Sequence, residues 1–351
     1  MASRLHKLGA RSLKSSAAPL WMSLRAGMRL VKGQGHNAGK VTILSYHRVV
    51  ADIIQAEQEA PCGMVISAET FRRQMELVSE HYEALPLDEA VAILRGERSA
   101  KRPALAITFD DGYRDFRELA WPILRELGLP ATVFVPTAYI GSGKILGHDR
   151  FYRYVTKAYS RGLSLRVPLA KAGLSAGMVS AVCAEVDSSR VYSHLSSLPF
   201  ALRERVLHSL DEFMCDPREE EPNGFSLLDW EMVREMAGCG VSFGAHTDNH
   251  VILPLEDEQT IEREILRSKR TLEEKLGRPV RHFAYPTGRY NAAVRNAVAS
   301  AGFEAAVTTD RRLNRRGDDL HALGRICLCE ESTRGITGRY SEAVAHLRLA
   351  A

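Results

Sequence analysis

A buried strand that ends in two adjacent carboxylates constrains this chain more than any other stretch. Residues 104–109 are apolar and β-prone, as expected for a strand inside a larger fold. Asp110 and Asp111 follow at once, at the strand end where α/β folds place their chemistry. Neighbouring carboxylates repel each other, so both stay ionised only beside positive charge, which a metal ion would supply. The alternative is an Asp-Asp-Gly turn whose acids cap a helix that begins near Asp115.

Two histidines follow another short strand, residues 241–243, much later in the chain. His246 and His250 are four positions apart, so one helical turn would place both imidazoles on the same face. One carboxylate and two histidines can hold a divalent metal and leave positions open for water and substrate. Non-haem iron oxygenases use the same ligand set, so the spacing favours a metal site without fixing the metal or its reaction.

Strands and helices alternate along most of the chain, and the β-α-β order at its start indicates a parallel sheet. Residues 140–225 interrupt this alternation, and their helical patterns predict a mostly helical insertion or lid. His148 and Asp149 lie at its start and could face the site, but we favour their interpretation as ordinary loop and cap residues. We expect a loop over residues 51–66. The main predicted strands cover residues 41–46, 104–109, 131–136, 241–243, 281–284, 304–308 and 320–328.

Composition and charge exclude several classes of protein. Hydrophobic residues make up 45% of the 351 and charged residues 26%, which is ordinary for a globular protein with a sizeable core. A net charge of +4 is too small for a dedicated nucleic-acid binder. The six cysteines form no CxxC pair, so we expect a reduced, cytoplasmic setting. No apolar run approaches the ~20 residues that span a bilayer.

The first 40 residues form a separate basic segment with eight lysines and arginines and no acid. Pro19 interrupts its apolar stretch, which argues against a secretory signal. Apolar residues recur at helical spacing from Leu20 to Val31, so we expect an amphipathic basic helix that can contact an anionic membrane surface. The alternatives are a helix docked on its own domain, a loosely ordered tail, or an organellar transit peptide, which the segment also resembles.

Several motifs together resemble the polysaccharide deacetylases, the NodB-homology or carbohydrate esterase 4 family, in the exopolysaccharide-deacetylase-like subgroup. Independent motifs in the family's order carry more weight than any one alone. The resemblance covers roughly residues 41 to 330 apart from the insertion, and we place the domain at residues 41–340. The matching stretches are Ser45-Tyr-His47-Arg, Thr108-Phe-Asp-Asp-Gly-Tyr113, His246-Thr-Asp-Asn-His250, Phe283-Ala-Tyr-Pro-Thr-Gly288, Gly302–Thr309 and Leu323-Gly-Arg-Ile326.

The resemblance implies a fold and a mechanism. The fold would be a distorted (β/α)7-type barrel with the helical insertion after its third to fourth strand. Asp110 would be the catalytic base, and a metal-bound water held through Asp111, His246 and His250 would be the nucleophile. The metal would be zinc, with cobalt, nickel or manganese as alternatives. Substrate-binding residues would be Tyr113, Tyr285, Pro286 and Thr287, the last through a main-chain N–H that holds the oxyanion.

Two departures from the family pattern leave roles to be filled. The arginine that orients the base in many members is replaced by Ala284, and Arg325 is our candidate substitute, with a structural surface arginine as the alternative. The usual Leu-x-His motif that supplies a general acid is absent, and His321 does not fit its pattern. His47 would lie near the site, either functionally or as a hydrogen-bonded histidine under a loop.

We therefore expect a metal-dependent hydrolase that removes N-acetyl groups from an amino sugar in a polysaccharide, glycoconjugate or lipid-linked intermediate. The alternatives are a deacylase of another amide and a catalytically silent carbohydrate-binding barrel. An intact set of metal-ligating residues argues against the silent form, because sugar binding does not need them.

Overall fold

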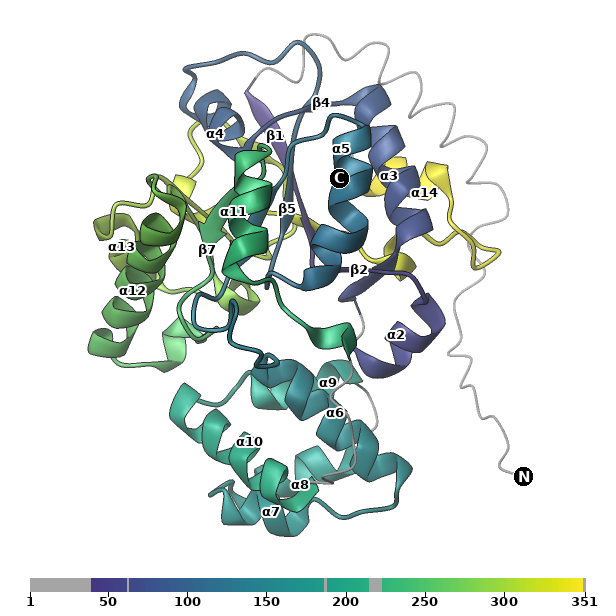
Figure 1. Ribbon diagram of the computed structural model, residues 1–351, viewed down its shortest axis with the longest axis vertical. Helices are drawn as coiled ribbons and strands as arrows, with labels where there is room; N and C mark the ends of the chain where they lie inside the picture. Colours follow the sequence, from purple (N-terminus) through teal and green to yellow (C-terminus); the bar gives the residue numbers. More distant parts are fainter. Residues whose placement is uncertain (1–38, 62, 186–187, 215–222, 350–351) are drawn as a thin grey trace.

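A curled, mainly parallel β-sheet forms the centre of the molecule (Figure 1). The computed structural model describes residues 39–61, 63–185, 188–214 and 223–349. The strand order is β10-β1-β5-β6-β7-β8-β9, with β10 antiparallel to β1 and the other neighbours parallel. The strands are β1 (Lys40–Tyr46), β5 (Ala104–Phe109), β6 (Thr132–Val135), β7 (Ser242–Ala245), β8 (His282–Ala284), β9 (Ala305–Val307) and β10 (Asn314–Arg315).

The segment after β10 contacts strands at opposite sides of the curled sheet, β9 at one end of the strand order and β1 next to the other end. Leu323 forms a parallel bridge with Val307 of β9. A few residues later, β11 (Ile326–Cys327) pairs in parallel with β1. The short β4 (Glu83–Ala84) pairs with β5, and β2 (Arg48–Val50) pairs with β3 (Val65–Ser67) in a small separate sheet. The protein is thus a mixed α/β fold, as the alternating pattern predicted.

Alternate residues of the central strands face two different cores, because side chains along a strand point to opposite sides. On β5, Leu105 and Ile107 belong to the larger core, whereas Ala104 and Ala106 belong to a smaller one that α4 (Leu87–Arg95) covers. The larger core is built with α3 (Ala68–His81), α5 (Trp121–Glu126), α11 (Trp230–Gly238), α12 (Glu258–Leu276), α13 (Ala292–Ser300) and α14 (Glu342–Leu349).

Five helices between β6 and β7 form a group at one end of the molecule (Figure 1). We call residues 147–214 the helical segment. It has an apolar cluster of its own, which includes Leu169 and Leu207, both fully buried. The prediction of helices in this part of the sequence is therefore confirmed. Its helices are α6 (Gly147–Ser160), α7 (Arg166–Lys171), α8 (Ala176–Ala184), α9 (Ser188–Leu195) and α10 (Phe200–Met214).

Two local predictions were wrong. Residues 51–66 are not a loop, because they contain α2 (Ile53–Glu59) and the start of β3. Asp52 caps α2 by accepting hydrogen bonds from the first backbone N–H groups, and an aspartate before a helix is the sequence signal for this start. Residues 320–328 form only the two-residue β11, because Asp319 accepts a hydrogen bond from the His321 N–H and begins a 3-10 turn there.

The expected basic helix falls on residues 1–38, which lie outside the described residues, so it stays a prediction. Across the part of the chain that the structure describes, no helix has the length and apolar character required to cross a bilayer.

Candidate active site and metal centre

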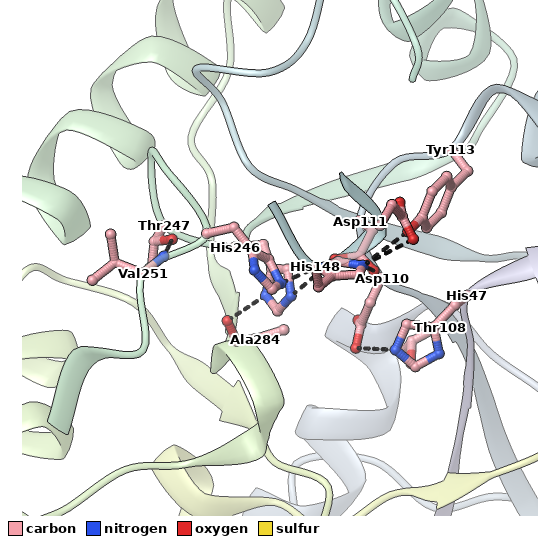
Figure 2. Close-up of polar contacts among 12 residues, drawn as sticks. His47, Thr108, Asp110, Asp111, Tyr113, His148, His246, Thr247, Val251 and Ala284 are labelled. Carbon is pink, nitrogen blue, oxygen red and sulfur yellow. Dashed lines mark hydrogen bonds and ion pairs between the residues drawn. The ribbon is translucent and has the colours of Figure 1, made fainter. Parts of the chain in front are cut away.

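Polar residues that follow β1, β5 and β7 meet at one edge of the sheet, because these parallel strands all end there (Figure 2). Asp110 and Asp111 follow β5, and His246 follows β7. His47 follows β1, so a fourth polar side chain joins them. These residues are far apart in sequence but come together through the order of the strands.

Asp111, His246 and His250 form a buried cluster whose ligand atoms all lie within 4.8 Å of one another. The Asp111 Oδ1 atom is 3.2 Å from His250 Nε2 and 3.6 Å from His246 Nε2. His246 Nδ1 hydrogen-bonds to the Ala284 carbonyl over 2.7 Å, so Nδ1 carries the proton and Nε2 presents a lone pair. This second contact of a ligating histidine is typical of metal sites.

Two further observations show that these residues fit a divalent cation. Burial and the nearby His250 lower the pKa of His246 to about 4, so its imidazole is neutral and available as a ligand. Asp111 Oδ1 is buried, and no described residue makes a well-aligned hydrogen bond to it. Burial alone would raise the pKa of Asp111, but His250, His148 and His47 hold it well below its usual value. An ionised carboxylate oxygen that faces two imidazole nitrogens is a ligand set for a cation.

Backbone strain is concentrated in this cluster. Among the described residues, the non-glycine residues with positive φ are Asp111 (71°), Thr247 (63°), His250 (53°) and Thr287 (60°). Positive φ is rare for a β-branched residue such as threonine. Strained backbone of this kind persists at functional sites, where the surrounding structure enforces it. These residues fall in three of the deacetylase-like stretches, 108–113, 246–250 and 283–288.

The four-residue spacing suggested that His246 and His250 share a helical turn, but they do not. Residues 246–250 form a loop, and its positive-φ residues bring the rings to 4.9 Å between centroids. The buried Glu264 of α12 holds this loop, since its carboxylate accepts the backbone N–H groups of Asp248 and Asn249 at 3.1 and 2.8 Å. The predicted proximity of the rings is correct, but the local structure that produces it is different.

Asp110 forms a two-pronged pair with Arg325. The guanidinium donates to both carboxylate oxygens, at 2.7 and 2.6 Å, and both side chains are buried. Arg325 also donates to the Thr308 carbonyl at 2.8 Å and the Thr108 hydroxyl at 3.2 Å, which fixes its plane. Burial would raise the pKa of Asp110, but the Arg325 charge and hydrogen bonds keep it below the usual value. The structure therefore places Arg325 on the base candidate and not on the surface.

His47 also lies beside Asp110, with its Nε2 atom 4.0 Å from Asp110 Oδ2 (Figure 2). Burial would lower its pKa, but a hydrogen bond with the Cys327 side chain and the charges of Asp111 and Asp110 raise the pKa of His47 to about 9. At neutral pH its imidazole is therefore protonated. The structure thus places this histidine near the site, as expected, and its functional role stays a prediction.

The helical segment supplies two residues that we had interpreted as ordinary loop and cap residues. His148 and Asp149, in the first turn of α6, are 5% and 1% exposed and lie beside the metal cluster. The Tyr113 hydroxyl contacts both, at 3.0 Å from His148 Nε2 and 2.8 Å from Asp149 Oδ2. The available signal was a His-Asp pair directly after a glycine-rich loop, but nothing in the sequence shows which site such a pair reaches.

The predicted substrate-binding residues have different surroundings. Tyr113 is 1% exposed, and its hydroxyl faces the helical segment. Tyr285 is fully buried and donates to the His321 carbonyl at 2.9 Å, so its side chain is part of the core and not of an open groove. Pro286 is also buried, whereas Thr287 is half-buried. The Tyr285 side chain thus packs in the core, and its expected role in substrate binding stays a prediction.

Comparison with known proteins agrees with this geometry. The model of the family described as polysaccharide deacetylase matches residues 97–182 and 185–306, more than half of the chain. The chain belongs to the polysaccharide deacetylase family. It is accordingly an amide-hydrolysing enzyme of the deacetylase class. A curated relative, YxkH of Bacillus subtilis (strain 168), is 22% identical over 306 residues, which cover 87% of this chain and 77% of that protein. Its own description as a polysaccharide deacetylase is provisional.

Solved deacetylases share the fold. The deacetylase PplD of Streptococcus pyogenes, solved with acetate, has a TM-score of 0.57 at 21% identity and aligns over 84% of this chain and 94% of its own. IcaB of Ammonifex degensii has a TM-score of 0.55 at 20% identity, over 84% and 94%. A de-N-acetylase of Aggregatibacter actinomycetemcomitans has a TM-score of 0.55 at 16% identity, over 85% and 98%. At these identities the likeness concerns the fold.

Proposed function

We propose that this polysaccharide deacetylase removes N-acetyl groups from an amino sugar of a polysaccharide, glycoconjugate or lipid-linked intermediate. In this proposal Asp111, His246 and His250 hold a divalent metal, and Asp110 is the general base. The observation that carries it is the position of the Arg325-bound Asp110 carboxylate directly beside the buried Asp-His-His cluster. Amide hydrolysis needs a base next to an electrophilic centre, so that both can act on the same water and acyl group.

The ligand set suits zinc, with cobalt, nickel or manganese as alternatives. When bound, such an ion would lower the pKa of a water and polarise the acyl oxygen of the substrate. Asp111 contributes the negative charge that attracts the ion, and His246 contributes a neutral nitrogen whose orientation the Ala284 carbonyl fixes.

Asp110 acts on water as an ionised, oriented carboxylate. Because Arg325 holds the pKa of Asp110 below its usual value, the carboxylate is free of a proton at neutral pH and can accept one from the attacking water. The two-pronged contact also fixes the plane of the carboxylate, a geometry that arginine provides and lysine does not. Arg325 thus fills the role left open by Ala284.

His47 is the proposed proton donor to the leaving amine. Its imidazole carries a proton at neutral pH and lies next to Asp110. The general base, Asp110, and the general acid, His47, are therefore two different side chains of the same site. The main-chain N–H of Thr287 is the proposed oxyanion donor, and the strained φ of 60° at this residue is the observation in its favour.

We also propose a closed barrel for the sheet and a cytoplasmic location for the protein. The bridge between Leu323 and Val307, with the pairing of Ile326 and Leu44, supports closure of the sheet into a distorted (β/α)7-type barrel with residues 140–225 as its insertion. A cytoplasmic location, with the N-terminal basic segment touching a membrane, remains part of the proposal and rests on the sequence.

Acetate release from chitooligosaccharides and from a small acetyl ester, with and without a chelator, tests the function. We expect chelator-sensitive release from the wild type. Asp110→Asn should lower kcat about 100- to 10,000-fold while zinc remains bound, because the base is lost and the ligands are kept. Asp52→Asn is the matched control, since Asp52 caps α2 at the surface and asparagine caps equally well. Full activity of Asp110→Asn would overturn the assignment.

A further inference from the structure

The helical segment reaches the metal centre through a histidine that the proposed mechanism does not use. His148 Nε2 lies 3.9 Å from Asp111 Oδ2, and the His148 ring is 5.2 Å from the His250 ring between centroids. Figure 2 shows His148 in the same cluster as Asp111 and Tyr113, and it contacts both. A buried imidazole in this position affects the carboxylate that it faces, because electrostatic effects are strong where water is excluded.

The hydrogen bonds of Tyr113 indicate which atom of His148 carries the proton. The Tyr113 hydroxyl has one hydrogen and donates it to Asp149 Oδ2 over 2.8 Å. Its contact with His148 Nε2, at 3.0 Å, therefore requires the imidazole to be the donor. The Nε2–H group is consequently directed at the Tyr113 oxygen, and two carboxylate oxygens lie near the same nitrogen, Asp149 Oδ1 at 3.6 Å and Asp111 Oδ2 at 3.9 Å.

Tyr113 is in turn positioned by Arg48, which packs against its ring. The Arg48 guanidinium lies 5.2 Å from the centre of the Tyr113 ring and 4.8 Å from that of Phe225. Arg48 also pairs with Asp115 at 3.0 Å and donates to the Gly224 carbonyl. The chain on both sides of the helical segment is thus tied to the tyrosine that orients His148.

We propose that His148 is a positioning residue that orients the Asp111 carboxylate for metal binding, an inference that rests on the proposed metal centre. At 3.9 Å the contact is electrostatic and too long for a hydrogen bond. It attracts Oδ2 toward the helical segment and leaves Oδ1 directed at the nitrogens of His246 and His250. Groups behind a metal ligand typically change metal affinity 10- to 100-fold when they are removed.

Zinc affinity, measured by competition with a chromophoric chelator, tests this role without relying on activity. We expect His148→Leu to bind Zn²⁺ about 10- to 100-fold more weakly than the wild type. His148→Gln should recover most of the affinity, because its amide N–H can occupy the place of Nε2–H. The visible absorption of bound Co²⁺ should change in His148→Leu and return toward the wild-type spectrum in His148→Gln, a signature that a loss of packing alone would not give.

His208→Leu is the matched control, since this histidine lies on α10 of the same segment with its side chain 76% exposed. It should bind Zn²⁺ like the wild type. Should His148→Leu fail to fold, Tyr113→Phe replaces it and is expected to weaken binding severalfold. Wild-type affinity in a folded His148→Leu, or in Tyr113→Phe when that variant replaces it, would overturn the positioning role alone. If the wild-type protein itself bound no Zn²⁺ or Co²⁺, the proposed metal centre would fall, and this inference with it.

Discussion

The sheet and the helical segment contribute to the same site in different ways. The sheet supplies residues that follow its strands, and their positions are set by a few neighbouring residues and the strand order. The helical segment supplies residues from helix faces, which reach the site only because the segment packs against the sheet edge. The comparison indicates that the chemistry is carried by local motifs, whereas its support depends on tertiary contacts.

A second contact from the helical segment supports this division. The buried Arg203 of α10 donates to the His250 carbonyl at 2.9 Å. Its guanidinium also lies 5.4 Å from the centre of the Phe200 ring. The segment thus touches the metal cluster at two points, through His148 on the Asp111 side and through Arg203 on the His250 side.

The largest effect is expected for the sheet residue Arg325. Arg325→Met would leave the Asp110 charge buried without its partner, which costs about 3–5 kcal/mol of unfolding free energy. Activity should fall at least as much as in Arg325→Lys, because neither variant keeps the two-pronged contact. Urea unfolding and acetate release measure the two effects.

The control is Arg72→Met, which removes a two-pronged pair with Glu126 at the surface, at 3.0 and 2.8 Å. We expect a change of no more than about 1 kcal/mol there. Equal losses of unfolding free energy in Arg325→Met and Arg72→Met would mean that the buried ion pair of Arg325 contributes no more than a surface ion pair.

A smaller effect is expected for the pH dependence of His282 on β8. Burial lowers the pKa of His282 to about 4, so the folded protein keeps this imidazole neutral. Below the unfolded-state value of about 6.5, the unfolded chain takes up a proton that the folded chain does not, so stability falls as the pH falls from 6.5 toward 4. Between pH 8 and pH 5 this amounts to about 2 kcal/mol.

Urea unfolding of the wild type and His282→Gln at both pH values isolates that contribution, since the other titrating groups are shared. The variant should lose less stability on acidification than the wild type. An equal loss in both proteins would show that His282 does not stay neutral in the folded core.

The smallest effect is expected for Arg203 of the helical segment. Arg203→Met should weaken Zn²⁺ binding about tenfold, or about 1.4 kcal/mol, because the His250 carbonyl loses the donor that fixes its loop. Arg205→Met, two positions along the same helix at an exposed site, should leave binding unchanged. A larger loss of activity in Arg203→Met than in Arg325→Met would reverse the division of roles between the two regions.

The sequence predicted the parts of the molecule that local patterns encode. The buried strand before Asp110 and the strand before His246 are identifiable from a few residues each, and the family motifs related them to each other. The Asp111, His246 and His250 cluster and the contact between Arg325 and Asp110 agree with that reasoning.

The rest depended on long-range contacts or unusual backbone. The loop from His246 to His250 needs positive φ at Thr247, which no propensity favours. His148 and Asp149 reach the site only through the packing of α6, and their sequence resembles that of any helix start. Tyr285 belongs to a motif but is in the core, because a motif does not reveal the direction of each side chain.

The most direct test of the account is anomalous diffraction from crystals grown with Zn²⁺, recorded on both sides of the zinc absorption edge. The account predicts one strong peak within bonding distance of Asp111, His246 and His250, about 2.0–2.2 Å from their oxygen and nitrogen ligands. The Asp110 carboxylate should remain paired with Arg325 and should not coordinate the ion. A peak elsewhere, or no ordered ion at saturating Zn²⁺, would contradict it.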